Sequence, residues 1–387
     1  MIKNTYRVFI REVKKIFTNK DLLLICFAAP IFYGLLFSYL YINKRAVDLN
    51  ISMSSYENTA QTRKLIRSID ASPEMNIIKT QANPYDTYED ILEDKADGFY
   101  FIPRNFSKNL KKGRQAVAID GVNASNFMVS SAILKKLFDI ASQFPKQTFT
   151  KTLVQNGFSY QSAQTLFHPL RTDSRYIFNS QMNYSDFLLP ALLLAVLQQI
   201  LLVAVCSSLS GEKKNNTQKE LYETAGMSFT ALFIGKIFPY IFVGSILNIM
   251  NIFIMLPIND IYASSMISLF IVSTAFIIAI LSFAILISAF FKSPETALAA
   301  LMFYSLPTFL MSGFAWPHYA FPLYLQIFSL FFPSTYAVNH IRMLTLGGID
   351  LQYSIFPTLS LLTFALICYF AARLVERKTR KIFDLEG

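Results

Sequence analysis

The stretch MSGFAWPHYAFPLYLQIFSLFFPSTYAVNHIRMLTLGG, from Met311 to Gly348, decides how this chain is interpreted. It is apolar and aromatic, yet Pro317, Pro322 and Pro333 divide it into short helical pieces. Irregular backbone at membrane depth survives only where protein or water satisfies its polar groups. We therefore expect a broken re-entrant hairpin over residues 313–340, which dips into the outer half of a bilayer and returns. An external loop lying flat on the membrane surface is the alternative.

The chain around this stretch has the composition of an integral membrane protein. Of its 387 residues, 53% are hydrophobic and 16% are charged, whereas soluble globular proteins carry roughly 25% charged residues. The net charge of +10 does not indicate nucleic-acid binding, because no motif interleaves basic and aromatic residues. The three cysteines lie inside apolar runs and are expected to be buried hydrophobic residues rather than disulfides: Cys26, Cys206 and Cys368.

Apolar and polar segments alternate in a way that predicts an α-helical polytopic membrane protein with six spans. Residues 1–20 form a basic amphipathic helix, which lies on an anionic membrane surface and, in a second interpretation, also braces a cytoplasmic partner. Basic residues flank the first and last spans, so both ends, including the 376–387 tail, are expected in the cytoplasm. The first span covers 21–43, and the others, within 183–375, are 186–209, 228–256, 263–291, 296–312 and 354–375.

Residues 44–182 are polar and long enough for a domain, which this topology places outside the cytoplasm. Strand-like and helical segments alternate there and predict a small α/β domain. The expected strands are 47–53, 75–79, 98–102 and 116–119, and the expected helices are 57–70, 85–94, 124–144 and 147–156. The acids Asp90, Glu93, Asp94 and Asp97 are interpreted as the solvated face of a helix.

Several polar residues lie inside the predicted spans. Gln198 and Gln199 fall in the second span, and Asn248 and Asn251 lie three residues apart in the third. Buried amides of this kind either hold helices together or line a substrate path, and both interpretations stay open. Lys236, near the inner end of the third span, is expected to extend to the membrane interface.

Four patterns along the chain deserve comparison with known sequences. Glu212 is followed by TQKEL at 217–221, and GKIFPY occupies 235–240. SGFAWP at 312–317 precedes FPSTY at 332–336. The remaining features are Arg342 after that block and IPRNFS at 102–107 in the polar domain.

Taken in this order, the patterns resemble the permease subunits of ABC exporters of the ABC-2 class, which have the type V exporter fold. The first is similar to the acidic coupling-loop pattern E-x-x-x-G-T-x-E-x-L, although Asn216 replaces the glycine and the second acidic position is displaced or filled by Lys219. The others are similar to G-K-x-x-P-Y, to S-G-x-x-x-P…P-x-T-Y…R and to the large-ectodomain members. The acidic motif of those members is absent, since Met53-Ser54-Ser55 takes its place.

The resemblance implies a permease that is not an enzyme, with no catalytic residue, no metal and no cofactor of its own. ATP and Mg would bind a separate ATP-binding subunit, which fits the absence of a phosphate-binding loop here. That subunit would dock on the 211–226 loop and on the N-terminal helix. The candidate coupling residues are Glu212, Lys213, Glu220 and Glu223.

The resemblance further implies a pathway shared with a second permease, identical or paralogous. Its candidate lining residues are Gln198, Gln199, Asn248, Asn251, Phe309, Phe314 and Trp316. Because these candidate lining residues are so apolar as a set, we expect a hydrophobic or amphipathic substrate, such as a drug, a lipid or a lipid-like product. The expected location is the bacterial cytoplasmic (inner) membrane, among its lipids, and the external domain could meet a periplasmic adaptor.

Two other classes of protein remain as alternatives. A membrane-anchored sensor or envelope assembly protein would bind a ligand or partner through the external domain, but the sequence offers no cytoplasmic output element beyond short loops. A polytopic membrane enzyme would need converging reactive side chains at one depth. The only candidates for that are His318, His340 and Asp350.

Overall fold

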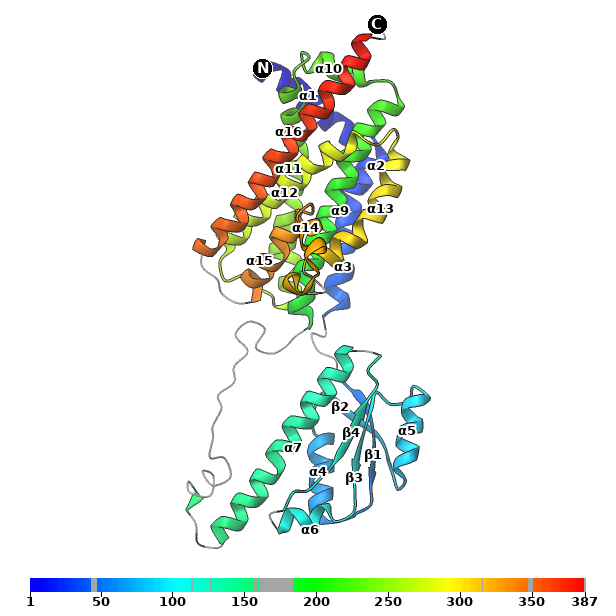
Figure 1. Ribbon diagram of the computed structural model, residues 1–387, viewed down its shortest axis with the longest axis vertical. Coiled ribbons are helices and arrows are strands. Elements are labelled where there is room, and N and C mark those ends of the chain that lie inside the picture. The colour runs from blue at the N-terminus through cyan, green and yellow to red at the C-terminus, as the bar shows by residue number, and fades with distance from the viewer. Residues whose placement is uncertain are drawn as a thin grey trace. The chain divides into compact units, whose positions relative to one another are not determined.

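The computed structural model describes residues 1–42, 47–112, 114–125, 127–155, 157, 159–160, 184–314, 316–346 and 351–385. The chain divides into two compact units, which are described separately (Figure 1). The helical unit comprises Met1–Lys44 and Tyr176–Gly387, and the α/β unit comprises Arg45–Arg175.

The helical unit begins with α1 (Ile2–Thr18), which leads through α2 (Lys20–Leu23) and a π-helical turn (Leu24–Ala28) into α3 (Ala29–Leu40). Asn19 ends α1 and caps α2, since its side chain accepts the backbone N–H groups of Asp21 and Leu22. The remaining helices are α9 (Tyr184–Lys214), α10 (Gln218–Thr224), α11 (Phe229–Met250), α12 (Met266–Ser288), α13 (Pro294–Met311), α14 (Leu323–Ser329), α15 (Ser334–Leu346) and α16 (Ile355–Leu385).

Five helical segments among the described residues are long and apolar enough to cross a membrane. They are Lys20–Leu40, Tyr184–Lys214, Phe229–Asn259, Met266–Ser288 and Gln352–Arg377. The predicted fifth span at 296–312 is a helix, α13, but it is not among these five. It opens with Pro294 and Glu295 and contains Pro307, which reduce its apolar character.

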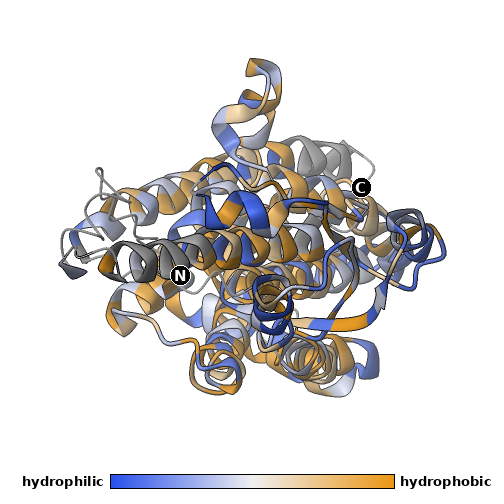
Figure 2. Ribbon diagram, turned by 90° about the horizontal axis from the view of Figure 1, so that it is seen from below, coloured by the Kyte–Doolittle hydropathy of each residue, from blue (hydrophilic) through white to orange (hydrophobic). Residues whose placement is uncertain are grey.

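The core of the helical unit is built around α9 and α12. α9 packs against α3, α12, α13 and α15, and α12 also packs against α16. Both central helices bury most of their side chains, and all three cysteines are free and buried, as the sequence predicts. Hydrophobic residues also run along many of the helices (Figure 2). Large apolar side chains such as Phe303 and Phe370 stay exposed, which is typical of a lipid-facing surface.

The stretch after α13 consists of short helical pieces, as its prolines predict. A 3-10 turn (His318–Ala320) precedes α14, and α15 packs back against α9 and α12. Side chains satisfy the interrupted backbone: Gln326 donates to the Phe321 carbonyl at 2.8 Å, and Thr335 donates to the Ser329 carbonyl at 2.7 Å. This irregular segment is therefore held by its own hydrogen bonds.

The α/β unit has a four-stranded sheet of order β2-β1-β3-β4. β1 is parallel to β2 and β3, and β4 is antiparallel to β3. α4 and α7 cover one face and α5 covers the other (Figure 1), as two right-handed crossovers in opposite directions require. The elements are β1 (Leu49–Ser55), α4 (Ala60–Asp70), β2 (Met75–Gln81), α5 (Pro84–Leu92), β3 (Gly98–Ile102), α6 (Phe106–Lys111), β4 (Ile119–Val122) and α7 (Phe127–Gln155).

Three predictions for this unit were wrong in detail. The strand expected at 116–119 is β4, which begins where that range ends. The two helices expected at 124–144 and 147–156 are one helix, α7, which continues through Pro145. Asp90 is buried rather than solvated, because α5 packs on the sheet. The Asp90 carboxylate accepts hydrogen bonds from Ser52 and Gln81.

Candidate functional site

Close contact between α1 and α11 creates the first candidate site. A Cβ atom on Gly235 would lie 2.6 Å from the Val8 Cβ and 2.9 Å from the Thr5 carbonyl oxygen. Only glycine therefore allows the two helices to approach this closely. The approach buries one face of α1, formed by Val8, Glu12 and Ile16, against the helical unit.

A buried ion pair between Glu12 of α1 and Lys236 of α11 lies next to this contact. Glu12 and Lys236 are 0% and 1% exposed, and the Lys236 ammonium bonds the Glu12 carboxylate. Lys236 also donates to the Ser208 hydroxyl at 2.9 Å, and Tyr240 donates to Glu12 at 2.8 Å. Burial raises the pKa of Glu12, but the positive charges of Lys236 and Lys15 outweigh it, so the pKa lies below its usual range. Lys236 is thus buried and paired with Glu12 of α1, and its position relative to a membrane interface stays a prediction.

A second buried carboxylate, that of Glu212 at the end of α9, extends this set of hydrogen bonds and ion pairs. Glu212, 2% exposed, accepts two hydrogen bonds from the Arg11 guanidinium, each at 2.9 Å, and one from Lys15 at 2.7 Å. Thr217, which precedes α10, also donates to this carboxylate. Arg11 reaches α10 as well, with its Nε 3.6 Å from Glu220. We call these residues the charge cluster: Arg11, Glu12, Lys15, Ser208, Glu212, Lys236 and Tyr240.

The charge cluster joins four segments that are far apart in the sequence. α1, the end of α9, α10 and the start of α11 meet around it, and α1, α10 and the C-terminal part of α16 lie at the same end of the helical unit (Figure 1). Removing one member of a buried ion pair typically destabilises a protein by about 3–5 kcal/mol. These segments are therefore expected to move together, because separating them exposes or unpairs buried charges.

A second candidate site is a cavity of about 410 Å³ among α3, α9, α13 and the segment after α13. Its volume lies in the range of small-molecule pockets, about 300–1,000 Å³. Four of the predicted pathway residues line it: Gln198, Gln199, Phe309 and Phe314. Gln199 donates to the Leu301 carbonyl at 3.1 Å, whereas the Oε1 of Gln198 has no hydrogen-bond partner among the described residues. We call this space the pathway cavity.

Comparison with known protein families finds a match over most of the chain. The model of the ABC-2 family transporter protein matches residues 20–374, which is most of the chain. The chain belongs to the ABC-2 transporter family. A comparison with curated proteins finds no match.

Within this ABC-2 transporter protein, the four predicted coupling residues fall into two groups. Glu212 and Lys213 are held by their own chain, since Lys213 donates to three carbonyls near the end of α12, on Ser288, Ala289 and Phe291. Glu220 and Glu223 lie on α10 and are exposed. Any contact that α10 makes with another subunit would use the second group, while Glu212 positions α10.

The other predicted pathway residues do not line the pathway cavity. Asn248 is buried and donates to the Ser273 hydroxyl at 2.7 Å, which holds α11 to α12. Asn251 begins a π-helical turn (Asn251–Met255) after α11. Trp316 is 58% exposed. Asn248 therefore behaves as a link between helices in this chain.

Sequence reasoning missed the partner of the GKIFPY motif. Gly235 admits α1, Lys236 binds Glu12, and Tyr240 donates to the same carboxylate. The available signal was Glu12 itself, an acid inside a strongly basic amphipathic helix. Its spacing from Val8 and Ile16, four residues on either side, places all three on one helical face.

The residues considered for an enzyme are separated. His318 contacts the Ser329 hydroxyl at 2.6 Å, and His340 contacts the Ser354 hydroxyl at 3.0 Å. Asp350 lies outside the described residues. Among the described residues, no group of three His, Cys, Asp or Glu side chains is placed to hold a metal ion.

Proposed function

We propose that this chain is the membrane-spanning permease subunit of an ABC exporter, driven by a separate subunit that binds ATP and Mg. A second permease, identical or paralogous, would complete the pathway in a bacterial cytoplasmic membrane. The observation that carries the proposal is the charge cluster. It fastens the exposed helix α10 to α1 and to the end of α9, so that a push on α10 is transmitted into the spans.

The proposed topology has six spans, with α13 as the fifth. Its 18 residues give a length of about 27 Å at 1.5 Å per residue, close to the ~30 Å hydrocarbon core. Both termini and α10 would then lie in the cytoplasm, and the α/β unit outside, where a periplasmic adaptor could meet it. The hairpin over 313–340 would lie in the outer half of the bilayer, where its hydrogen-bonded backbone avoids unpaired polar groups.

α1 suits a position between the membrane surface and the ATP-binding subunit. One face packs on the helical unit through Val8, Glu12 and Ile16, while Tyr6 and Phe17 are 63% and 62% exposed. These aromatic side chains would enter the headgroup region, as in other interfacial helices. The charge cluster then prevents α1 from moving independently of α10.

The pathway cavity is the proposed substrate route on this permease. It is lined mostly by apolar and aromatic side chains, which suits a hydrophobic or amphipathic substrate. ATP-driven closure of the partner subunits would alter the position of α9, the helix that contributes both Glu212 and Gln198. Transport follows if the two arrangements of the cavity differ in substrate affinity.

The proposal is tested by purifying the tagged protein from its native membrane in mild detergent and assaying the eluate for ATP hydrolysis. An ATP-hydrolysing subunit is expected to co-purify. Reversing both exposed acids of α10, Glu220→Lys with Glu223→Lys, is expected to abolish that association. The free energy of unfolding should fall by no more than about 1 kcal/mol, since only the exposed pair of Glu220 with Arg11 is lost.

The matched control reverses two exposed acids of the α/β unit, Glu89→Lys in α5 with Glu93→Lys directly after it, and should leave the association intact. An eluate that lacks ATPase activity in several detergents would count against the exporter function. Association that survives the α10 reversal would instead reject α10 as the docking element.

A further inference from the structure

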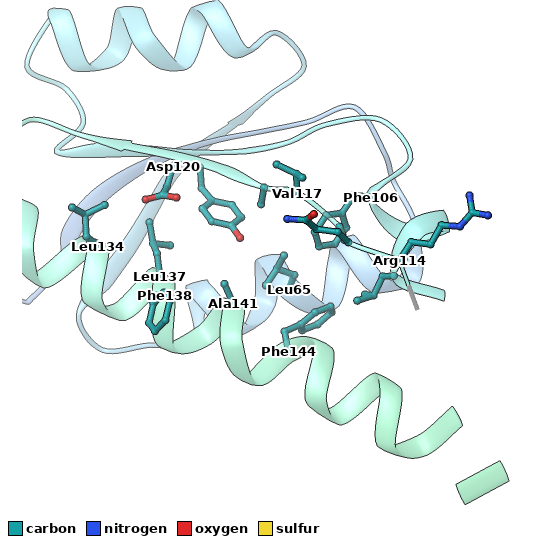
Figure 3. A pocket seen from close by; sticks show the side chains of 15 residues that line it. Leu65, Phe106, Arg114, Val117, Asp120, Leu134, Leu137, Phe138, Ala141 and Phe144 are labelled. Carbon is teal, nitrogen blue, oxygen red and sulfur yellow. The ribbon is translucent and has the colours of Figure 1, made fainter. Parts of the chain in front are cut away.

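A cavity in the α/β unit has no part in the proposed coupling or pathway. Its volume is about 700 Å³, and it lies on the α4–α7 side of the sheet (Figure 3). Strand β3 contributes Tyr100, α4 contributes Leu65, and residues 114–118 pass over it before β4. The volume is typical of pockets that take drug-sized or single-chain lipid molecules.

One wall of this cavity is a long apolar stripe on α7. Leu134, Leu137, Phe138, Ala141 and Phe144 line it and recur at helical spacing. From the first to the last of them, α7 rises about 15 Å, at 1.5 Å per residue. Leu134 and Phe138 remain 42% and 72% exposed, so the stripe is open to a ligand. The wall therefore fits an extended alkyl chain.

The two charged side chains that line this cavity differ in whether they lie beside the apolar stripe. Of its lining residues, only Asp120 and Arg114 carry charge. Figure 3 shows the Asp120 carboxylate beside Leu134 and Leu137, at one end of the apolar stripe, whereas the Arg114 side chain extends away from the cavity. Tyr100 is 3% exposed, and burial together with Asp120 raises its pKa to about 12, so its hydroxyl stays neutral. The end of the cavity next to Asp120 thus favours a positive group.

We propose that this cavity binds a single-chain amphiphile with a cationic head, the alkyl chain lying along α7 and the ammonium group beside Asp120. The ring of Phe138, which is 72% exposed, would add cation–π attraction. The proposal that this site binds such a molecule depends only on the cavity and its lining residues. Its role as a receiving site for substrate rests on the proposed export function, and it narrows the substrate class to lipophilic cations.

The test measures binding of radiolabelled decyltrimethylammonium to the full-length protein in nanodiscs of zwitterionic lipid by equilibrium dialysis. Ala141→Trp fills the cavity and supplies the background from partition into lipid. The wild type is expected to show saturable binding above that background. Asp120→Asn should weaken binding about threefold to fivefold, in line with a partly exposed charge pair. Glu89→Gln, on the opposite face of the sheet, should change nothing.

Decyl sulfate, with the same chain and the opposite charge, should bind at least about tenfold more weakly than the cation, since attraction is replaced by repulsion. The proposal is overturned if binding equals that of Ala141→Trp, if the two amphiphiles bind equally, or if Asp120→Asn has no effect. The measurement involves neither ATP hydrolysis nor transport. Its failure would therefore leave the permease function standing, and a missing ATP-binding subunit would leave this binding site standing.

Discussion

The charge cluster and the pathway cavity both contain buried polar groups of the same helical unit. They differ in how fully those groups are hydrogen-bonded. In the charge cluster, Glu12 and Glu212 are each surrounded by several donors. In the pathway cavity, Gln198 contributes to the lining, but its Oε1 is fully buried and has no partner among the described residues. A saturated network fixes helices in place, whereas a buried unpaired group holds its helix less firmly and gains a partner if a small movement exposes it to a ligand or water.

The largest expected effect comes from breaking the ion pair of the charge cluster. Glu12→Met leaves the Lys236 ammonium buried without its carboxylate, since Glu212 is 3.9 Å away and already bound by Arg11 and Lys15. The free energy of unfolding is expected to fall by about 3–5 kcal/mol. Denaturant-induced unfolding in detergent micelles measures this loss.

The double variant Glu12→Met with Lys236→Met separates an unpaired charge from a simple loss of packing. It replaces the pair by apolar groups and should recover most of the loss, because buried ion pairs contribute little beyond a well-packed apolar pair. If the double variant is as unstable as Glu12→Met alone, the charge cluster stabilises through packing, and its contrast with the cavity is lost.

The next effect concerns the approach that forms the charge cluster. Gly235→Ala places a methyl group 2.6 Å from the Val8 Cβ, so α1 must shift. Overpacking of this kind costs about 1–3 kcal/mol. The matched control is Gly211→Ala in α9, where the nearest atom is 3.7 Å away and alanine improves helix propensity. Thermal unfolding of the two variants in detergent should shift in opposite directions, and equal shifts would mean that α1 adapts freely.

The helices and strands follow from local patterns in the sequence, and most of them were predicted. Prolines at 317, 322 and 333 predicted the short pieces after α13, and the alternation of apolar residues at 47–53 predicted β1. Errors occurred where tertiary contacts override local signals. α7 continues through Pro145, and Asp90 is buried because α5 packs against a serine and a glutamine from the sheet.

The candidate sites were less accessible to sequence reasoning, because they depend on pairs distant along the chain. Glu12 and Lys236 are separated by more than 200 residues, and no single-sequence pattern joins them. The same holds for Arg11 and Glu212. The family resemblance did point to four residues that line the cavity, which are Gln198, Gln199, Phe309 and Phe314. The sequence did not distinguish these four residues from Asn248, which donates a hydrogen bond to Ser273 and does not line the cavity.

The smallest effect is expected in the pathway cavity, and it decides whether the contrast with the charge cluster is real. Gln198→Leu removes an amide whose Oε1 has no partner, so stability should stay within about 0.5 kcal/mol or rise. Gln199→Leu, its neighbour, loses a hydrogen bond to Leu301, worth about 0.6 kcal/mol between membrane helices. Unfolding in detergent compares the two. A larger loss for Gln198→Leu would mean that Gln198 is a structural link, as Asn248 is. A neutral Gln198→Leu that alters which substrates stimulate ATP hydrolysis would mean that the unpaired oxygen faces substrate, because only a group left free by the protein is available to a ligand.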